Sequence, residues 1–299
     1  MFKLREALVE ACITLIIGGL IGATVGVVAN LFVIGVESLG AHREASSLFS
    51  VNLGGQMVSF SSLLFLWAAA AAVLFIKTSL NINQWAGPAD SIFAAQQQYQ
   101  PLNIKQGFAS TLGAFASAGG GASVGQYGPI VHFGATVGVW AKRFVSSRLS
   151  DDIYLGCGVA AAISAGFNAP IAGIIFAHEA VLRHFSMRAI APITIASISA
   201  STLGNYWFPN TASLNIAAVV PSLSEVVPTL VVLAPMFSLV AIVFMLTLRR
   251  ASSVASLLKL SPTKLLFLGA TICGLVGLWI PQILGLGISS INHMIAGEF

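Results

Sequence analysis

Long apolar runs separated by short polar breaks dominate this 299-residue chain. Three of them, Leu8–Val36, Met57–Lys77 and Val227–Leu248, are long enough to cross the roughly 30 Å hydrocarbon layer of a membrane as single helices. A fourth, Lys264–Ile280, is just long enough. The first run is too long for the core of a signal peptide, so we expect it to stay in place as a membrane span.

Between Gly107 and Tyr206 the pattern changes. Apolar pieces of only about 10 to 18 residues are separated by Gly, Pro and Asn. Backbone exposed to lipid leaves costly unpaired polar groups, so such pieces indicate broken helices that are buried in protein or line a watery cavity. Short, interrupted apolar segments are also a sequence pointer to a transport site. We therefore predict an all-α, polytopic membrane fold with broken, re-entrant helices.

Composition supports a membrane protein. Hydrophobic residues make up 57% of the chain and charged residues 8%, whereas soluble domains carry about 25% charged residues. This excludes a disordered chain, a disulfide scaffold and an ordinary cytosolic enzyme. Basic residues beside the spans account for the net charge of +4, so we expect the lipid bilayer as a partner and no nucleic acid. The three cysteines, Cys12, Cys157 and Cys273, have no metal-ligand spacing, and we expect neither a metal nor a cofactor.

Loop charges predict part of the topology. Lys3 and Arg5 place the N-terminus in the cytoplasm, and residues 38–56 carry only one Lys or Arg. Basic residues then crowd the connection after residue 248, beginning with Arg249 and Arg250. This pattern agrees with the positive-inside rule and predicts a multi-pass protein of the inner or plasma membrane.

Small residues recur every four positions before the first of the breaks. Gly113, Ser117, Gly121 and Gly125 are predicted to share one helix face. Small faces let helix backbones approach closely in lipid. We interpret these residues as packing residues without direct chemistry.

The stretch from Gly125 to His132 carries the most chemical information. Pro129 favours the first turn of a helix, and a helix that starts there exposes backbone N–H groups with a partial positive charge. Such a start binds an anion without a cationic side chain. An ordinary helix break is the alternative interpretation.

Two further helix starts are predicted in the same apolar region. One lies in Trp85–Asp90, and the other lies in Gly166–Pro170, where Asn168 can cap the helix that carries Ile171–Leu182. Several starts in one region make a convergent anion site more plausible. Glu179, deep in an apolar run, either has a partner and a function inside the membrane or lies at the membrane surface.

An enzyme remains an alternative. Gly121–Gly125 matches the Gly-x-Ser-x-Gly nucleophile elbow around Ser123, which requires a preceding strand. An intramembrane serine protease would pair Ser123 with His132 or His178. The neighbouring His178 and Glu179 do not form a zinc-protease motif, because position 182 is Leu.

Together these segments resemble the CLC family of chloride channels and chloride/proton exchangers. Gly125–Pro129 resembles the family's Gly-Lys/Arg-Glu-Gly-Pro block, and Phe167–Pro170, followed by Phe176 and Glu179, resembles its Phe-Asn-Ala-Pro segment. Ala86–Asp90 lies where the family has Gly-Ser-Gly-Ile-Pro-Glu. The stretch from Gly285 to Phe299 resembles a later block.

The resemblance implies two inverted repeats, with helix N-termini that hold a dehydrated chloride near the membrane midplane. Residues 1–226 would form the first repeat, and residues 227–299 the opening helices of an incomplete second one. The family's gating glutamate corresponds to Tyr127, its proton glutamate to Ala180 and its anion-binding serine to Ala86. A tyrosine does not exchange protons readily at neutral pH, so the resemblance implies transport without proton coupling.

The resulting prediction is a pathway for chloride or a similar anion, with Tyr127 at the gate and Glu179 and His132 as candidate residues of the ion pathway. The resemblance also implies a homodimer for the full-length protein. The alternative is a non-conducting membrane subunit, and the chain itself is either a fragment or a truncated member. The predicted anion-binding residues are Ala86, Gly87, Gly128, Pro129, Ile130 and Val131.

Overall fold

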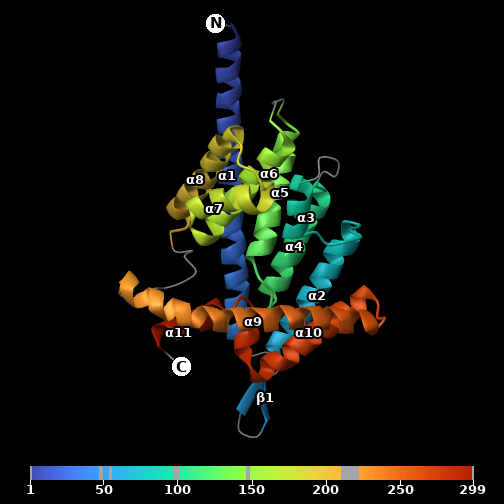
Figure 1. Ribbon diagram of the computed structural model, residues 1–299. Coiled ribbons are helices and arrows are strands. Elements are labelled where there is room, and N and C mark those ends of the chain that lie inside the picture. Colours follow the sequence, from blue (N-terminus) through green and yellow to red (C-terminus); the bar gives the residue numbers. More distant parts are fainter. Residues whose placement is uncertain are drawn as a thin grey trace.

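In the computed structural model, the residues described are 2–46, 50–53, 56–96, 102–145, 149–209 and 222–297. Almost all of their regular structure is helical (Figure 1). The elements are α1 (Phe2–Ala45), β1 (Ser50–Leu53), β2 (Gln56–Ser59), α2 (Ser61–Ser79), α3 (Pro88–Gln96), α4 (Ile104–Gly119), α5 (Tyr127–Lys142), α6 (Asp151–Phe167), α7 (Pro170–Phe176), the π-helix η1 (Ala177–Leu182), α8 (Met187–Trp207), α9 (Leu223–Leu257), α10 (Pro262–Trp279), the 3₁₀-helix η2 (Pro281–Ile283) and α11 (Ile288–Ala296).

The four predicted membrane spans are confirmed as helices. Among the described residues, the helices long and apolar enough to cross a membrane are Glu10–Ala45, Ser61–Ser79, Ser224–Leu257 and Pro262–Trp279. The start of the second span differs from the prediction, because Gln56–Ser59 forms β2, which pairs antiparallel with β1. Pairing with β1 satisfies the backbone of this segment, and the helix begins only at Ser61.

The interrupted middle region forms a series of short helices, as predicted. Helices α3 to α7 contain 9, 16, 16, 17 and 7 residues. Helices α4, α5 and α6 pack with α8 against the long rod of α1, which runs through this part of the molecule (Figure 1), and α3 and α7 pack on α6. Helices α3 to α7 are shorter than the roughly 20 residues of a typical membrane span, and many of their residues are buried among neighbouring helices.

Glycines on α1 bring this helix close to α8. Gly18, Gly22 and Gly26 are spaced by four residues and face the backbone of α8. A Cβ atom on Gly22 would collide with the Ala196 carbonyl oxygen, and one on Gly26 would lie 2.9 Å from Ala200 Cα. This is the close backbone approach that small residues permit between membrane helices.

Glycines also join α5 to α6. A Cβ atom on Gly134 would collide with the Gly158 carbonyl oxygen, and one on Gly158 with the Gly134 carbonyl oxygen. One turn further along, a Cβ atom on Gly138 would collide with the Tyr154 carbonyl oxygen. This backbone contact fixes the position of α5 relative to α6, and hence the place of the first residues of α5 in the structure.

The predicted small face from Gly113 to Gly125 is wrong beyond Gly119. Helix α4 ends there, and Gly121 has a φ of +98°, a conformation that strongly favours glycine. The N–H of Ala122 donates to the Ser117 carbonyl at 3.1 Å and closes the helix end. Gly121 and Gly125 therefore belong to the turn before α5, whereas Gly113 and Ser117 remain on the helix.

Helix α9 is arranged differently from the bundle. It runs transverse to α1 in Figure 1, and none of its side chains described in the structure is buried. Helix α10, by contrast, packs against α2, where a Cβ atom on Gly274 would lie 2.6 Å from Leu63 Cδ1. The segment 222–297 thus contacts the bundle through α10 rather than through its longest helix.

Candidate functional site

The starts of α3 and α5 lie against each other. A Cβ atom on Gly128, the second residue of α5, would lie 3.3 Å from Cγ of Pro88, the first residue of α3. Helix α5 begins at Tyr127, two residues before the predicted start, so Pro129 lies inside its first turn. Two of the predicted helix starts are therefore brought together.

A cavity of about 270 Å³ lies between these two starts. Ala86, Gly87, Pro129 and His132 line it, which unites four of the predicted residues from two separate segments. No Lys or Arg is among the described residues that line this cavity. The first N–H groups of a helix lack partners within the helix and carry a partial positive charge, so an anion here would be stabilised by backbone rather than by a full cation.

At the start of α3, two backbone donors are already engaged within the protein. The Ala86 N–H donates to Ser110 Oγ at 2.9 Å. The Gly87 N–H donates to Oδ2 of Asp90 at 2.7 Å, which caps the helix with a carboxylate. Direct contact between these two N–H groups and an anion remains a prediction, and it requires the partners to be displaced.

At the start of α5, Gly128, Ile130 and Val131 were also predicted to bind the anion, but they are not among the described residues that line this cavity. The side chains of Ile130 and Val131 are 2% and 6% exposed and lie in the apolar core. The Ile130 N–H donates to the Gln126 carbonyl over a long 3.4 Å. The backbone of Gly128 and Pro129 remains only partly buried.

Gln126, which immediately precedes α5, was not anticipated as a site residue. Its side chain is 2% exposed, and within the described part of the chain neither its Oε1 nor its Nε2 has a hydrogen-bond partner. A buried amide without partners is costly. Gln126 is the second residue of the Gly-x-x-Gly-Pro block Gly125–Pro129. This position in the sequence could have identified it as a site residue.

His132 joins the two helices at the same cavity. Its Nδ1 lies 2.7 Å from Oγ of Ser91 on α3, and both side chains are 1% exposed. Its Nε2 has no hydrogen-bond partner among the described residues. His132 was predicted from the sequence, whereas Ser91 and Ser110, the two serines that hold the α3 start, were not. Both are polar residues in apolar helices, which was the available signal.

Tyr127, at the predicted gate, connects α5 to the third helix break. Its ring stacks on Phe167 at the end of α6, with centroids 4.1 Å apart and planes at 28°. A Cβ atom on Gly166 would lie 2.9 Å from Tyr127 Cδ1. The aromatic pair therefore lies between the α5 start and the α6–α7 break.

The predicted role of Asn168 as an N-cap of the following helix is wrong. Asn168 ends α6 in a left-handed conformation, with a φ of +50°. Its Oδ1 accepts hydrogen bonds from Ser201 Oγ at 3.0 Å and from Asn205 Nδ2 at 2.9 Å. Ala169 occupies the N-cap position of α7, because the asparagine side chain is drawn to α8 instead.

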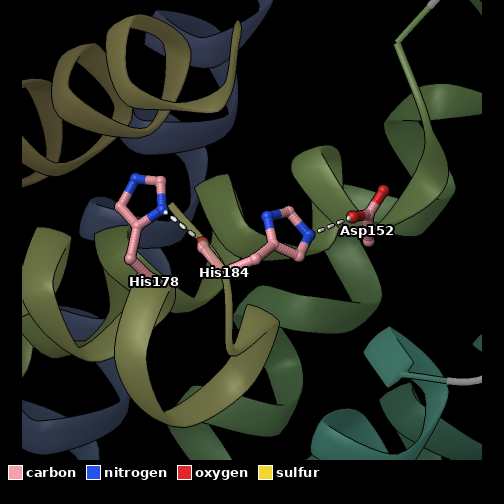
Figure 2. A network of polar contacts seen from close by, with 3 residues as sticks. All are labelled: Asp152, His178 and His184. Carbon is pink, nitrogen blue, oxygen red and sulfur yellow. Dashed lines mark hydrogen bonds and ion pairs between the residues drawn. The ribbon is translucent and has the colours of Figure 1, made fainter. Parts of the chain in front are cut away.

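Glu179 lies on the π-helix η1, and its side chain is exposed. Beside it, the imidazole of His178 is fully buried and stacks on Phe185. The Nδ1 of His178 lies 3.3 Å from the His184 carbonyl oxygen, and Nε2 of His184 lies 3.3 Å from Oδ2 of Asp152 (Figure 2). These contacts fasten the end of η1 to the start of α6, at some distance along the chain from Tyr127.

The protease alternative gains no support from this geometry. Helix α4, rather than a strand, precedes Ser123. His132 Nδ1 contacts Ser91, and His178 Nδ1 contacts the backbone of His184. The elbow match reflects the high content of glycine and serine in the turn.

Comparison with known proteins places these features in a family. Residues 68–299 match the family model described as "Voltage gated chloride channel". A Voltage-gated ClC-type chloride channel ClcB of Escherichia coli is 24% identical over 288 residues, which cover 92% of this chain and 68% of that protein. A Putative chloride channel protein ClcB-like of Ralstonia nicotianae is 24% identical over 200 residues, or 64% of this chain and 46% of that protein.

Solved structures share the fold. A CLC-type fluoride/proton antiporter superposes with a TM-score of 0.78 and 21% identity, over 96% of this chain and 71% of the antiporter. A slow cyanobacterial Cl⁻/H⁺ antiporter superposes with a TM-score of 0.74 and 17% identity, over 94% of this chain and 67% of that protein. The present chain thus spans between about half and about 70% of the length of these relatives.

Proposed function

The chain belongs to the voltage gated chloride channel (CLC) family, and from that premise we propose that it carries chloride or a similar anion past the starts of α3 and α5 without coupled proton movement. The observation that carries this proposal is the contact of Gly128 with Pro88, which brings two helix N-termini to one cavity. Partial charges at helix starts hold an ion more weakly than a full cation does, which suits an ion that must bind and then leave.

The absence of proton coupling is proposed from the gate residue. Two structural relatives are described as proton antiporters, and in the family resemblance the gating glutamate corresponds to Tyr127 and the proton glutamate to Ala180. A phenol thus replaces one of the two carboxylates at these positions, and a methyl group replaces the other. The ring of Tyr127 stacks on Phe167, which supports a role as a plug or as a hydrogen-bond donor.

A second candidate function is a non-conducting membrane subunit, which one observation favours. The N–H groups of Ala86 and Gly87 already donate to Ser110 and Asp90. The Asp90 carboxylate thus occupies a donor that an entering anion would need. If this cap is permanent, the α3 start contributes nothing to an anion pathway.

Chloride efflux from liposomes that contain the purified chain, with external pH recorded at the same time, tests both proposals. We expect chloride release without proton movement. Proton movement that follows the chloride gradient would overturn the uncoupled mechanism. No release from folded protein would overturn transport by this chain and favour the non-conducting subunit.

Tyr127→Ala sharpens this experiment. Removing the ring opens the route if Tyr127 is a plug, so we expect a faster efflux of chloride. Tyr206→Ala, at a tyrosine on α8 that is 79% exposed, is the matched control and should leave the rate unchanged. An unchanged or lower rate in folded Tyr127→Ala protein would exclude the plug.

The proposal extends to membrane topology and assembly. It places the N-terminus in the cytoplasm of a multi-pass protein of the inner or plasma membrane, with residues 1–226 as a first repeat and 227–299 as part of a second. It also includes a homodimer of the full-length protein. The four apolar helices support the membrane location. Single cysteines introduced in place of Lys3 and Lys77, labelled with a membrane-impermeant thiol reagent from each side of the membrane, test the orientation.

A further inference from the structure

A second cavity, of about 1090 Å³, lies where the end of α1 meets the start of α11. Glu37, Arg43 and Glu44 of α1 line one side, and Ile288, Ser289 and Ser290 of α11 line the other. Among the residues that the structure describes, this cavity shares no lining residue with the one between α3 and α5. It is far larger than a single halide ion requires.

Arg43 is a buried charge that the protein neutralises only weakly. Its side chain is 4% exposed, and among the described residues its Nε and Nη1 have no hydrogen-bond partner. Nη2 lies 3.1 Å from Oε1 of Glu44, whose own side chain is 68% exposed and therefore not enclosed by the protein. An arginine is always charged, and a buried guanidinium with unmade hydrogen bonds is strongly unfavourable unless acceptors are supplied.

The surrounding backbone is shaped to admit this guanidinium. A Cβ atom on Gly121 would collide with Nη1, and one on Gly285 would lie 3.4 Å from Nη1 and 3.6 Å from Nη2. The two glycines are joined by a hydrogen bond from the Gly285 N–H to the Gly121 carbonyl at 2.9 Å. Three distant parts of the chain therefore meet around Arg43.

The start of α11 adds further unmet donors. Gly287 precedes the helix in a left-handed conformation, and no side chain caps the start. The first N–H groups, on Ile288, Ser289 and Ser290, lack partners within the helix. The partial positive charge of the helix start and the charge of the arginine repel each other. An anion bound between them would be attracted by both groups and would remove this repulsion.

The negative charges of this cavity lie in a different place. Glu37 and Glu44 have exposed side chains and line the rim of the same cavity. The site thus presents a buried arginine, a partly exposed helix start and exposed carboxylates. Its position at the end of the Glu10–Ala45 span is where lipid headgroups are expected.

From this distribution of charge we propose that the cavity binds the zwitterionic headgroup of a phospholipid with an amine. The phosphate binds Arg43 and the N–H groups of α11, and the ammonium binds Glu37 and Glu44. Charge-assisted hydrogen bonds from arginine to phosphate are strong. The ligand ties the end of α1 to α11, and thereby holds the segment 222–297 against the bundle.

Thermal unfolding of the delipidated full chain in detergent tests this site. The added probes are dihexanoylphosphatidylethanolamine, dihexanoylphosphatidylglycerol and inorganic phosphate. We expect the ethanolamine lipid to raise the unfolding temperature most, and Arg43→Gln to weaken its binding about tenfold or more. Without lipid, Arg43→Gln should be at least as stable as the wild type, because a buried and poorly paired charge is removed.

Matched variants separate the parts of the site. Arg188→Gln, at an exposed arginine of α8, should respond to the lipid like the wild type. The double variant Glu37→Gln, Glu44→Gln should keep the response to phosphate-containing lipids and lose the preference for ethanolamine over glycerol.

Three results would overturn the proposal. An Arg43→Gln variant that binds the ethanolamine lipid like the wild type would exclude Arg43 as a ligand. An equal stabilisation by inorganic phosphate would exclude the lipid headgroup. The third result combines two observations: Arg43→Gln is less stable than the wild type without lipid, and no probe raises the unfolding temperature of the wild type. Together they would assign Arg43 a purely structural role. None of these depends on whether the chain conducts chloride.

Discussion

Helices α5 and α6 in the bundle and helix α9 in the later segment are all strongly apolar, yet they are used differently. Gly134 and Gly158 let α5 and α6 touch through their backbones, and most of both helices is buried. Helix α9 has no buried side chain among those described. Apolar content therefore indicates which segments enter a membrane, whereas spaced small residues indicate which of them pack together.

This difference has a functional consequence. The α3 and α5 starts need rigid support if their N–H groups are to face one cavity. The glycine contacts of α5 and the bond between His132 and Ser91 supply that support. Helix α9 supplies none, so changes there should leave the candidate site unaltered. Matched substitutions in the two regions test this division.

The largest effect is expected for Gly158→Ala on α6. The new methyl group would collide with the Gly134 carbonyl oxygen, which cannot move without shifting α5. We expect a loss of about 3 kcal/mol or more in the free energy of unfolding, measured by denaturant unfolding in detergent. Gly269→Ala on α10, where nothing lies within 4 Å, is the control and should be neutral or stabilising by up to about 1 kcal/mol. Equal effects would contradict the backbone contact.

A smaller effect is expected for Phe133→Ala on α5. Phe133 is 7% exposed and lies edge-on to Phe108, with centroids 5.7 Å apart. Its removal leaves a cavity that costs about 3 kcal/mol. Phe244→Ala on α9, at a side chain that is 62% exposed, should change stability by less than about 0.5 kcal/mol. A large loss in Phe244→Ala would show that α9 packs against protein.

The smallest effect is expected for Ser197→Ala on α8. The buried Ser197 hydroxyl donates to the Pro170 carbonyl at 2.8 Å and so holds the start of α7. Its loss should cost about 1 kcal/mol. Ser253→Ala on α9 removes an exposed hydroxyl bonded to the Arg249 carbonyl, and we expect no measurable loss. Identical unfolding curves for the two variants would argue against the difference between the regions.

Much of the fold was predictable because membrane helices leave a simple signal. Length and apolarity identified the four spans, and glycine and proline identified the breaks. The strand β2 at Gln56–Ser59 was not predicted, since a short strand directly before an apolar helix looks like the beginning of that helix. The end of α4 at Gly119 was missed because glycine is compatible both with a packed helix face and with a turn.

The candidate site was only partly predictable. Proline and glycine marked the starts of α3 and α5, but their contact depends on how helices far apart in the sequence pack. The capping of Gly87 by Asp90 and the bond between Ala86 and Ser110 depend on side-chain directions that a sequence does not give. Asn168 was misassigned for the same reason, since its partners lie on α8.

The most direct test of the central claim is a crystal structure of this chain with bromide in place of chloride, in which anomalous scattering locates the anion. The account predicts an anomalous peak in the cavity between the α3 and α5 starts, next to Gly87, Pro129 and His132. Crystals of folded protein in high bromide with no peak in this cavity would contradict it.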